Sequence, residues 1–347
     1  MTEETSFSVV VPCYNYAHYL KGCVESILCQ GVKVQVIVID DCSSDDTPAV
    51  GTSLAKDSRV TFLRHEVNQG HIQTYNEGLA LATGDYTALI SADDLLTPGA
   101  LKRAQAVFDT HPEVGMVYGH APYFQSNDTL PHARVGEPRV DIWDGRRWIA
   151  QRCKTATSCI SSPEVVVRTS LQQQLGGYCA DLPHAGDFEM WLRFAAHSRI
   201  AYLGRVDQAY YRRHPASMQE TRFNSILADL AQRRAAFEIV FHAHGHKIED
   251  MEQLREVALR ALAKEALWIA CWSYDRRRVD RVCVNDLEAF ASQTYPGARS
   301  LAEYWGLQWR RRLGPRWPPI LQPILPSGYL HWAKSKMLWR RQRVRGV

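Results

Sequence analysis

Two adjacent carboxylates, Asp93 and Asp94, follow the short apolar stretch 86–90 and stand a few residues before Pro98. The apolar stretch predicts a buried strand, and the proline favours a helix start. Carboxylates at the end of a strand are ligands for hard cations such as Mg²⁺, which can also contact a substrate phosphate. The alternative is a turn followed by a helix cap, because Asp is favoured in both.

The N-terminal half alternates short apolar runs with stretches at helical spacing, which predicts an α/β fold with a doubly wound, mostly parallel sheet. Polar residues follow three expected strands, at Asn15, Asp41 and Asp93. Ligands bind at the carboxyl ends of such strands, so we expect a nucleotide site there. The expected strands are 7–12, 34–40, 60–64, 86–90 and 114–118, and the expected helices are 16–28, 48–56 (capped by Thr47), 72–82 and 98–110.

Neither a G-x-G-x-x-G motif after the first strand nor a P-loop motif occurs in the chain. Dinucleotide and P-loop chemistry therefore lack the glycine loops that they require. A cation held by Asp93 would neutralise phosphates instead, which suits a nucleoside diphosphate as leaving group.

Five segments, in order along residues 6–218, resemble the family-2 inverting glycosyltransferases of the GT-A fold. They are VVVPCYNYAHYLKGCVESILCQ, VQVIVIDDCSSDDT, NQGHIQTYNEGLALATGDYTALISADDLLTPGAL, AGDFEMWLRFA and YYRRHPASM. The resemblance implies a catalytic domain at 1–218. Residues 219–347 share no such motif, and we divide them into a helical region at 219–300 and a tail at 301–347.

The resemblance implies a site for a nucleotide-sugar donor, most simply a UDP-sugar. Tyr14 would stack on the base, Asp41 would accept a hydrogen bond from it, and Gly70 would let the backbone approach the nucleotide. Each of these residues could instead serve only a turn or the edge of the core. The implied donor residues are Pro12, Tyr14, Asn15, Asp41, Asn68, Gly70, Asn76, Ala92, Asp93, Asp94 and Arg213.

The resemblance also implies a divalent metal, Mn²⁺ or Mg²⁺, with Asp93 as direct ligand and His214 facing the metal or the diphosphate. Most relatives carry Asp-x-Asp, whereas this chain has Ser91 at the first position. A site with fewer charges should bind the ion more weakly and depend more on the donor diphosphate.

Asp187 matches the general base of the family and precedes a stretch with apolar residues at helical spacing. A single base that takes the acceptor proton during direct displacement implies inversion. The alternative role is that of a helix cap. Glu189 is expected to face away, and Gly177 and Tyr178 would line the acceptor pocket.

Two other functions fit parts of the pattern. A nucleotidyltransferase of this fold would carry a glycine- and lysine-rich first loop, which residues 12–15 lack. A non-catalytic nucleotide-sugar-binding module would not need Asp41, Asp93 and Asp187 together. The acceptor of a transferase would be a carbohydrate, a lipid-linked molecule or a small molecule, as in the synthesis of surface polysaccharides, glycolipids or glycosylated natural products.

The overall charge of +4 combines +9 for residues 301–347 with −5 for the rest of the chain. The tail also holds five of the ten Trp residues, a composition typical of an interfacial anchor on anionic lipid. The alternative is a tail that packs on the body. Nucleic-acid binding is not expected, because no basic stripe continues into the rest of the chain.

No apolar run is long enough to span a bilayer and residues 1–7 lack the order of a signal peptide, so we expect a cytoplasmic protein, peripheral on the membrane if the tail is an anchor. The nine cysteines lack C-x-x-C pairs, which favours reduced thiols and no structural metal. The helical region would shape the acceptor site, mediate homo-oligomer assembly or contact the membrane.

Overall fold

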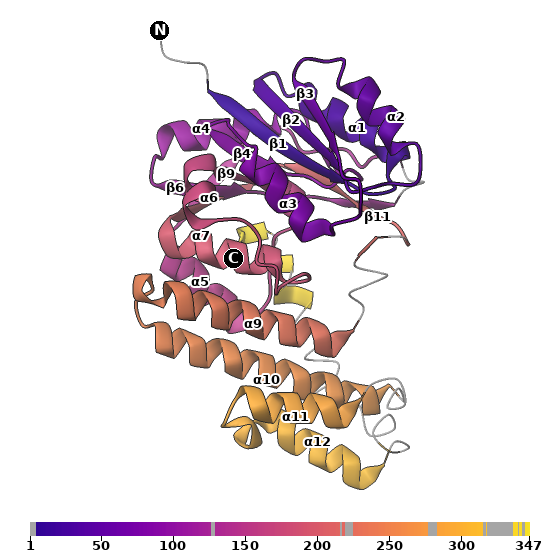
Figure 1. Cartoon of the computed structure of the whole chain (residues 1–347). Coiled ribbons are helices and arrows are strands. Elements are labelled where there is room, and N and C mark those ends of the chain that lie inside the picture. Colours follow the sequence, from indigo (N-terminus) through magenta and orange to yellow (C-terminus); the bar gives the residue numbers. More distant parts are fainter. Residues whose placement is uncertain are drawn as a thin grey trace.

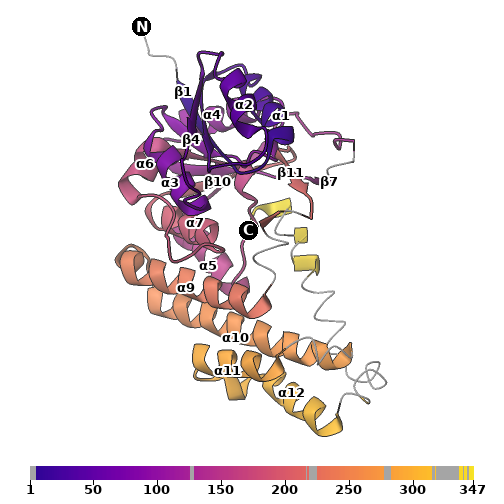
Figure 2. The same cartoon turned by 45° about the vertical axis from the view of Figure 1, so that its right-hand side comes forward.

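The computed structural model describes residues 5–125, 129–215, 217–218, 225–276, 283–314, 317, 336–338, 340–341 and 344–347. An α/β part occupies one end of the molecule and a layer of long helices the other (Figures 1 and 2). The strands are β1 Ser6–Cys13, β2 Lys33–Asp40, β3 Val60–Arg64, β4 Tyr86–Leu89, β5 Leu95–Leu96, β6 Val114–Tyr118, β7 Tyr123–Gln125, β8 Arg139–Trp143, β9 Val165–Arg168, β10 Arg199–Gly204 and β11 Ala209–Arg213. The helices are α1 Ala17–Leu28, α2 Thr47–Leu54, α3 His71–Ala80, α4 Ala100–Thr110, α5 Gly145–Thr155, α6 Thr169–Leu175, α7 Gly186–His197, α9 Ile226–His244, α10 Met251–Asp275, α11 Val284–Thr294 and α12 Ala302–Leu313, with 3-10 turns at Ser162–Glu164, Gly245–Lys247 and Ala298–Ser300.

The main sheet has eight strands in the order β3-β2-β1-β4-β9-β6-β10-β8. The first four strands are parallel, as is the pair of β6 and β10, whereas β9 and β8 run antiparallel to their neighbours. The α/β architecture with a mostly parallel sheet that was expected from the sequence is therefore confirmed, and two antiparallel strands are added beyond 114–118, where no strand was expected.

Strand β1 shows how one sequence supplies both faces of the sheet. Val9 and Val11 lie in a core with α1 and α4, while Val10 lies in a second core with α3 and α7. This alternation follows from the two-residue period of a strand. Side chains on both faces are buried, which explains the nearly continuous apolar sequence of β1 and β2.

The expected strands and helices of the first 118 residues are all present, with ends that differ by one or two residues. The cap of α2 was predicted wrongly. The helix begins at Thr47 and its N-cap residue is Asp46. Asp45 supplies the capping contact, because its Oδ1 accepts hydrogen bonds from the backbone N (3.0 Å) and the hydroxyl (2.5 Å) of Thr47.

A small second sheet, in the order β5-β11-β7, connects distant parts of the sequence. Strand β5 follows Asp94 directly, and it pairs antiparallel with β11, which ends just before His214. The register pairs Leu96 with Ala209 and Leu95 with Tyr210. This pairing brings residues about 120 positions apart to the end of β4.

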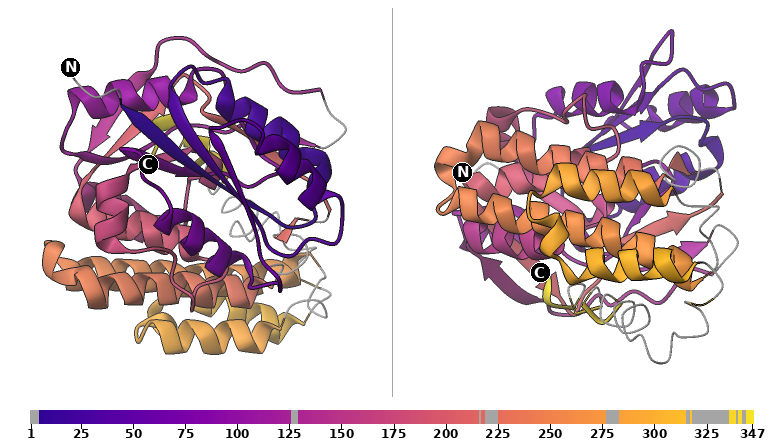
Figure 3. Two further views of the ribbon diagram at one scale, coloured as in Figure 1. Left: turned by 45° about the horizontal axis from the view of Figure 1, so that its top comes forward. Right: turned by 90° about the horizontal axis from the view of Figure 1, so that it is seen from below.

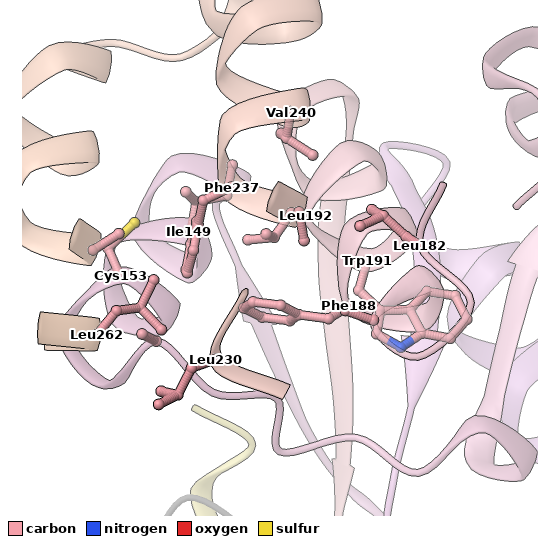
Figure 4. Close-up of a cluster of buried hydrophobic side chains, with 14 of the residues drawn as sticks. Ile149, Cys153, Leu182, Phe188, Trp191, Leu192, Leu230, Phe237, Val240 and Leu262 are labelled. Atoms are coloured by element: carbon pink, nitrogen blue, oxygen red, sulfur yellow. The ribbon is translucent and has the colours of Figure 1, made fainter. Parts of the chain in front are cut away.

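Helices α9 and α10 lie against the underside of the α/β part, and α11 and α12 pack on the side of α10 that faces away from it (Figures 1 and 3). They share its core, as Figure 4 shows for Phe188 of α7, Ile149 of α5 and Leu230 of α9. Phe188 and Phe237 meet edge to face, with ring centroids 5.1 Å apart. Burying such a side chain contributes about 1.5–3 kcal/mol, so the helical layer is fixed firmly against the α/β part.

The described parts of the tail behave in two ways. Helix α12 packs inward through Leu307 and through Arg310, which is paired with Asp275 at 2.8 Å, and the hydroxyl of Tyr118 donates to the carbonyl of Gly346. In contrast, Trp305 and Trp309 are 59% and 61% exposed. Trp332 and Trp339, which also entered the anchor prediction, lie outside the described residues.

Within the described ranges, no helix has the length and apolarity needed to cross a membrane. All nine cysteines are free thiols, and five of them are buried.

Candidate active site

A cavity of about 810 Å³ lies between the carboxyl ends of the parallel strands and the helical layer. Its walls include the ends of β1, β2 and β4, the start of α3, the loop before α7, and residues of α9 and α10. The site is therefore built from both the α/β part and the helical region. Such a volume is in the range of small-molecule sites.

Asp41, after β2, organises the loop before α3. Its Oδ1 accepts a hydrogen bond from Gln69 N (2.7 Å) and its Oδ2 from Gly70 N (2.9 Å), while Asn68 Nδ2 donates to its carbonyl (3.1 Å). Gly70 has φ 85° and ψ 156°, a conformation almost restricted to glycine. A carboxylate has about four lone-pair positions, so Asp41 can still accept a bond from a ligand.

Asn15 ties the loop after β1 to the loop after β2. Its Oδ1 accepts from Ser44 N (2.8 Å), and its own N donates to Ser43 Oγ (2.8 Å). Its φ of 59° lies in the left-handed region, which Asn tolerates better than most residues. Pro12 and Tyr14 line the cavity beside it, and the Tyr14 side chain is 45% exposed and open to a ligand.

His65 joins Asp41 to Glu77, with ring nitrogens 2.8 Å from a carboxylate oxygen of each. Burial alone would lower the pKa of His65, but the hydrogen bonds to Asp41 and Glu77 outweigh it and raise the pKa. The ionised imidazole is therefore favoured in the folded protein. Sequence analysis missed this residue because a single His after a strand carries no specific signal.

The raised pKa of His65 predicts pH-dependent stability. The contribution should be complete below the unfolded value near pH 6.5 and should decline as the pH rises through the folded value. His65→Gln should therefore lower Tm most near pH 6, and the difference from wild type should shrink toward pH 9. Thermal melts across this range measure it, and a difference that stays constant or grows with pH would contradict the assignment.

Asp93 and Asp94 occupy the turn between β4 and β5, and both are buried. Arg212 secures them, because its backbone N donates to Asp94 Oδ1 (2.8 Å) and its Nε donates to the Asp93 carbonyl (2.7 Å). Burial, followed by the charge of Asp93, raises the pKa of Asp94 well above its ordinary value. The guanidinium of Arg212 lies 4.3 Å from the ring centroids of both Tyr19 and Phe124.

The residues at the end of β4 fit a divalent ion that would gain further ligands from its substrate. Oδ1 of Asp93 is buried without a hydrogen-bond partner, which is unusual for a carboxylate oxygen. Oδ2 of the same residue lies 3.0 Å from Nε2 of His214. In the described part of the chain no three His, Cys, Asp or Glu side chains gather as a complete metal site. Asp93 and His214 could hold an ion only together with diphosphate and water oxygens.

Asp187 lies in the first turn of α7, on the same cavity. Its Oδ1 accepts a hydrogen bond from the Tyr178 hydroxyl (2.8 Å), and its Oδ2 accepts one from the Ser162 hydroxyl. Burial and the neighbouring Asp187 raise the pKa of Tyr178 well above its ordinary value, so the phenol keeps its proton and remains a donor. Glu189 points elsewhere, as expected, and is paired with Arg193 at 2.8 Å.

Asn76 and Gly177 influence Asp187 through Tyr178, which hydrogen-bonds to both Asn76 and Asp187. Asn76 Oδ1 accepts from Tyr178 N (2.6 Å), and Asn76 Nδ2 donates to Tyr178 O (3.0 Å). A Cβ at position 177 would lie 2.1 Å from Asn76 Oδ1, so only glycine permits this close approach. The pair holds Tyr178 in place beside Asp187.

The structure brings most of the expected site residues to one cavity. Five of them do not line it: Asn76, Ala92, Gly177, His214 and Arg213. Ala92 is buried, and Arg213 is exposed with its guanidinium 4.7 Å from the ring centroid of Tyr123. The expected residues that line the cavity are Pro12, Tyr14, Asn15, Asp41, Asn68, Gly70, Asp93, Asp94, Tyr178 and Asp187.

Sequence reasoning missed several residues that line the cavity. Ser162 precedes Pro163 in a 3-10 turn, and Tyr75 lies inside α3, so neither stands out by pattern. Asp229, Arg233 and Glu265 belong to α9 and α10, where charged residues usually face solvent.

Comparisons with known proteins show which family the sequence around this site resembles. Residues 8–162 match the family described as glycosyl transferase family 2. In this segment the chain is similar to the family-2 glycosyltransferases. It is 29% identical over 239 residues to an uncharacterized protein of Mycobacterium tuberculosis, an alignment that covers 65% of this chain and 73% of the relative. It is 33% identical over 136 residues to an uncharacterized glycosyltransferase of Nostoc, which covers 38% of this chain and 42% of the relative.

Among solved structures, residues 1–349 of S. aureus TarS in complex with UDP-GlcNAc share the fold of this chain, with a TM-score of 0.57 and 20% identity over 74% of this chain and 72% of that TarS 1–349 chain. The resemblance to this family predicted from five sequence segments is thereby confirmed.

Proposed function

We propose that this glycosyltransferase moves a sugar from a UDP-sugar to an acceptor hydroxyl, with inversion at the anomeric carbon and with a divalent ion, Mn²⁺ or Mg²⁺, at Asp93 and His214. The observation that carries the proposal is that Asp187 and the unpartnered Oδ1 of Asp93 belong to one cavity. The choice of uracil as base is supported by the UDP-GlcNAc complex of TarS.

Different residues of the cavity would bind the donor and activate the acceptor. Tyr14 would stack on the base and Asp41 would accept its imide N–H. The ion, when bound, would neutralise the charge that develops on the diphosphate leaving group. Asp187 would take the proton of the acceptor hydroxyl as the new bond forms.

The two hydroxyl donors on Asp187 have a chemical consequence. They use one lone-pair position on each oxygen and fix the plane of the carboxylate, and they leave further positions for the acceptor proton. Tyr178 and Ser162 would thus orient the Asp187 carboxylate and leave it able to accept a proton.

A donor screen tests the proposal. UDP-sugars with Mn²⁺ should raise Tm, because ligands that bind only the native state stabilise it according to their affinity. The best of them should also release UDP slowly when water is the only acceptor. GDP-, ADP- and CMP-linked sugars serve as controls for the base. If no nucleotide sugar raised Tm or were hydrolysed, the protein would be a transferase in fold only.

We also propose that the protein contacts an anionic membrane surface from the cytoplasmic side through α12. Trp305, Trp309 and Arg312 follow i, i+4, i+7 spacing on its exposed face, and Trp317 beyond it is 56% exposed. Indole rings together with cations are typical of interfacial helices.

Replacing both Trp305 and Trp309 by Ala should therefore reduce binding to vesicles that contain phosphatidylserine. Co-sedimentation at low salt measures the bound fraction. Trp268, on α10, is only partly exposed and offers a control, since Trp268→Phe should leave vesicle binding intact. If wild-type protein does not bind these vesicles, the membrane proposal is wrong.

A further inference from the structure

Charged residues of the helical region line the same cavity as Asp187. Asp229 and Arg233 come from α9, and Glu265 comes from α10. These helices pack against α5 and α7 through the buried apolar cluster shown in Figure 4. Leu230 and Leu262 of this cluster are close in sequence to Asp229 and Glu265. The charged wall is therefore a fixed part of the site.

The guanidinium of Arg233 is paired with protein groups on both sides. Its Nε donates to Asp229 Oδ2 (2.9 Å), its Nη1 donates to Ala156 O (2.9 Å) and Glu265 Oε2 (2.9 Å), and its Nη2 donates to Glu265 Oε1 (3.0 Å). Nη2 also lies 2.8 Å from Asp229 Oδ2. Four N–H groups of the guanidinium thus donate to protein oxygens, and Nη2 is also within ion-pair distance of Asp229, so the guanidinium is already paired with protein groups.

The two carboxylates keep capacity for a ligand. The side chains of Glu265 and Asp229 are 30% and 35% exposed, and each Glu265 oxygen accepts one hydrogen bond from Arg233. Asp229 also lies 2.9 Å from Nε2 of His184, in the loop before α7. Burial would raise the pKa of Asp229, but the hydrogen bond from His184 and the charge of Arg233 lower it. The wall thus presents two carboxylates beside one guanidinium and the imidazole of His184.

The same helix holds the loop that precedes Asp187. Gln232 Oε1 accepts from His184 N (3.2 Å) and Ala185 N (3.4 Å), and Gln232 Nε2 donates to Asp181 O (3.3 Å). A group bound at Asp229 would thus be positioned relative to Asp187 by α9, which carries Asp229 and also holds the loop before Asp187.

We propose that Asp229 and Glu265 form an acceptor subsite that binds hydroxyl or ammonium groups of a neutral or amino-bearing sugar and that excludes acidic sugars. This inference rests on the proposed function, since it names the acceptor class for the same cavity. The physical reason is that the two carboxylates offer hydrogen-bond acceptors and negative charge, while the guanidinium of Arg233 is already paired with protein groups. A carboxylate-bearing acceptor would meet like charge at this position.

The test uses the full chain, the UDP-sugar that gives the largest Tm shift, and three soluble probes: methyl glucoside, methyl glucosaminide and methyl glucuronide. A sugar that enters the subsite changes the rate of UDP release, either upward as an acceptor or downward by displacing water. The concentration for half of the maximal change is measured for each probe. We expect the neutral and amino sugars to act at concentrations at least about tenfold below the glucuronide, the scale of one hydrogen bond to a charged group.

Glu265→Gln and Asp229→Asn should each reduce this discrimination by about tenfold, whereas Glu256→Gln should not. Glu256 is exposed on the same helix as Glu265, nine residues or two and a half turns away. Because the readout is a ratio between sugars, a general loss of folded protein does not imitate the effect.

Three results would overturn the inference: a preference of wild type for the glucuronide, an unchanged ratio in both variants, or a rate that responds to none of the sugars. Failure of the proposed function is a different observation, namely that no nucleotide sugar binds or is hydrolysed at all.

Discussion

Asp187→Asn is expected to lower sugar transfer at least about a hundredfold while leaving donor binding near that of wild type, because general base catalysis supplies an acceleration of this scale. The amide keeps the shape of the side chain and can still accept one hydroxyl hydrogen bond. It cannot take the acceptor proton. Rates of UDP release with and without acceptor, combined with donor-induced Tm shifts, separate the two effects.

The control for this variant is Asp181→Asn. Asp181 is exposed in the loop before α7 and does not line the cavity. Asp187 also stands in the first turn of α7, where a negative charge stabilises the helix by about 0.3–1 kcal/mol. A modest drop in Tm is therefore expected of Asp187→Asn and does not count against the assignment. Turnover near the wild-type value would refute it.

Asp93→Ala is expected to abolish the part of donor affinity that depends on the divalent ion. In wild type, a chelator should weaken binding of UDP-sugar, whereas in Asp93→Ala the affinity should be low and the same with and without chelator. The reason is that Asp93 carries the buried oxygen that has no hydrogen-bond partner among the protein groups. Isothermal titration with Mn²⁺ or chelator measures the difference.

Ser91→Asp provides a gain-of-function arm of the same experiment. Ser91 lines the cavity, and an Asp there would restore the Asp-x-Asp pattern and add a charge, so metal-dependent affinity should be retained or increased. Asp109→Ala, on the exposed face of α4, is a matched control. Equal donor affinity of wild type with and without chelator would exclude a metal-dependent site.

The α/β half could be predicted from the sequence because its signals are local. The apolar runs of β1 and β2 and the Pro48 start of α2 each depend on neighbouring residues, and the structure has these elements within one or two residues of the expected ends. The order of the strands in the sheet could not be predicted from such local signals. Strand β9 enters between β4 and β6 from a position about 80 residues downstream of β4, and no local pattern encodes this pairing.

In the candidate site, too, residues in local sequence motifs could be predicted, whereas residues brought in by tertiary packing could not. Asp41, Asp93 and Asp187 were proposed because they match motifs of the family that the sequence resembles, each beside a recognisable strand or helix. Ser162, His65 and the charged wall of Asp229, Arg233 and Glu265 were not, because their relation to the cavity arises only from tertiary packing. Gly177 was expected in the acceptor pocket, and the structure gives it another relation to the site, as the residue that lets Asn76 approach and hold Tyr178.

The most direct test of the central claim is the configuration of the sugar that wild-type protein releases from its preferred UDP-sugar. Proton NMR, recorded before the free sugar mutarotates, distinguishes the two anomers. Direct displacement by water activated at Asp187 predicts that the first sugar to appear carries the anomeric configuration opposite to that of the donor. Release of the sugar with the donor configuration would contradict inversion by a single base and would require a different reaction at this site.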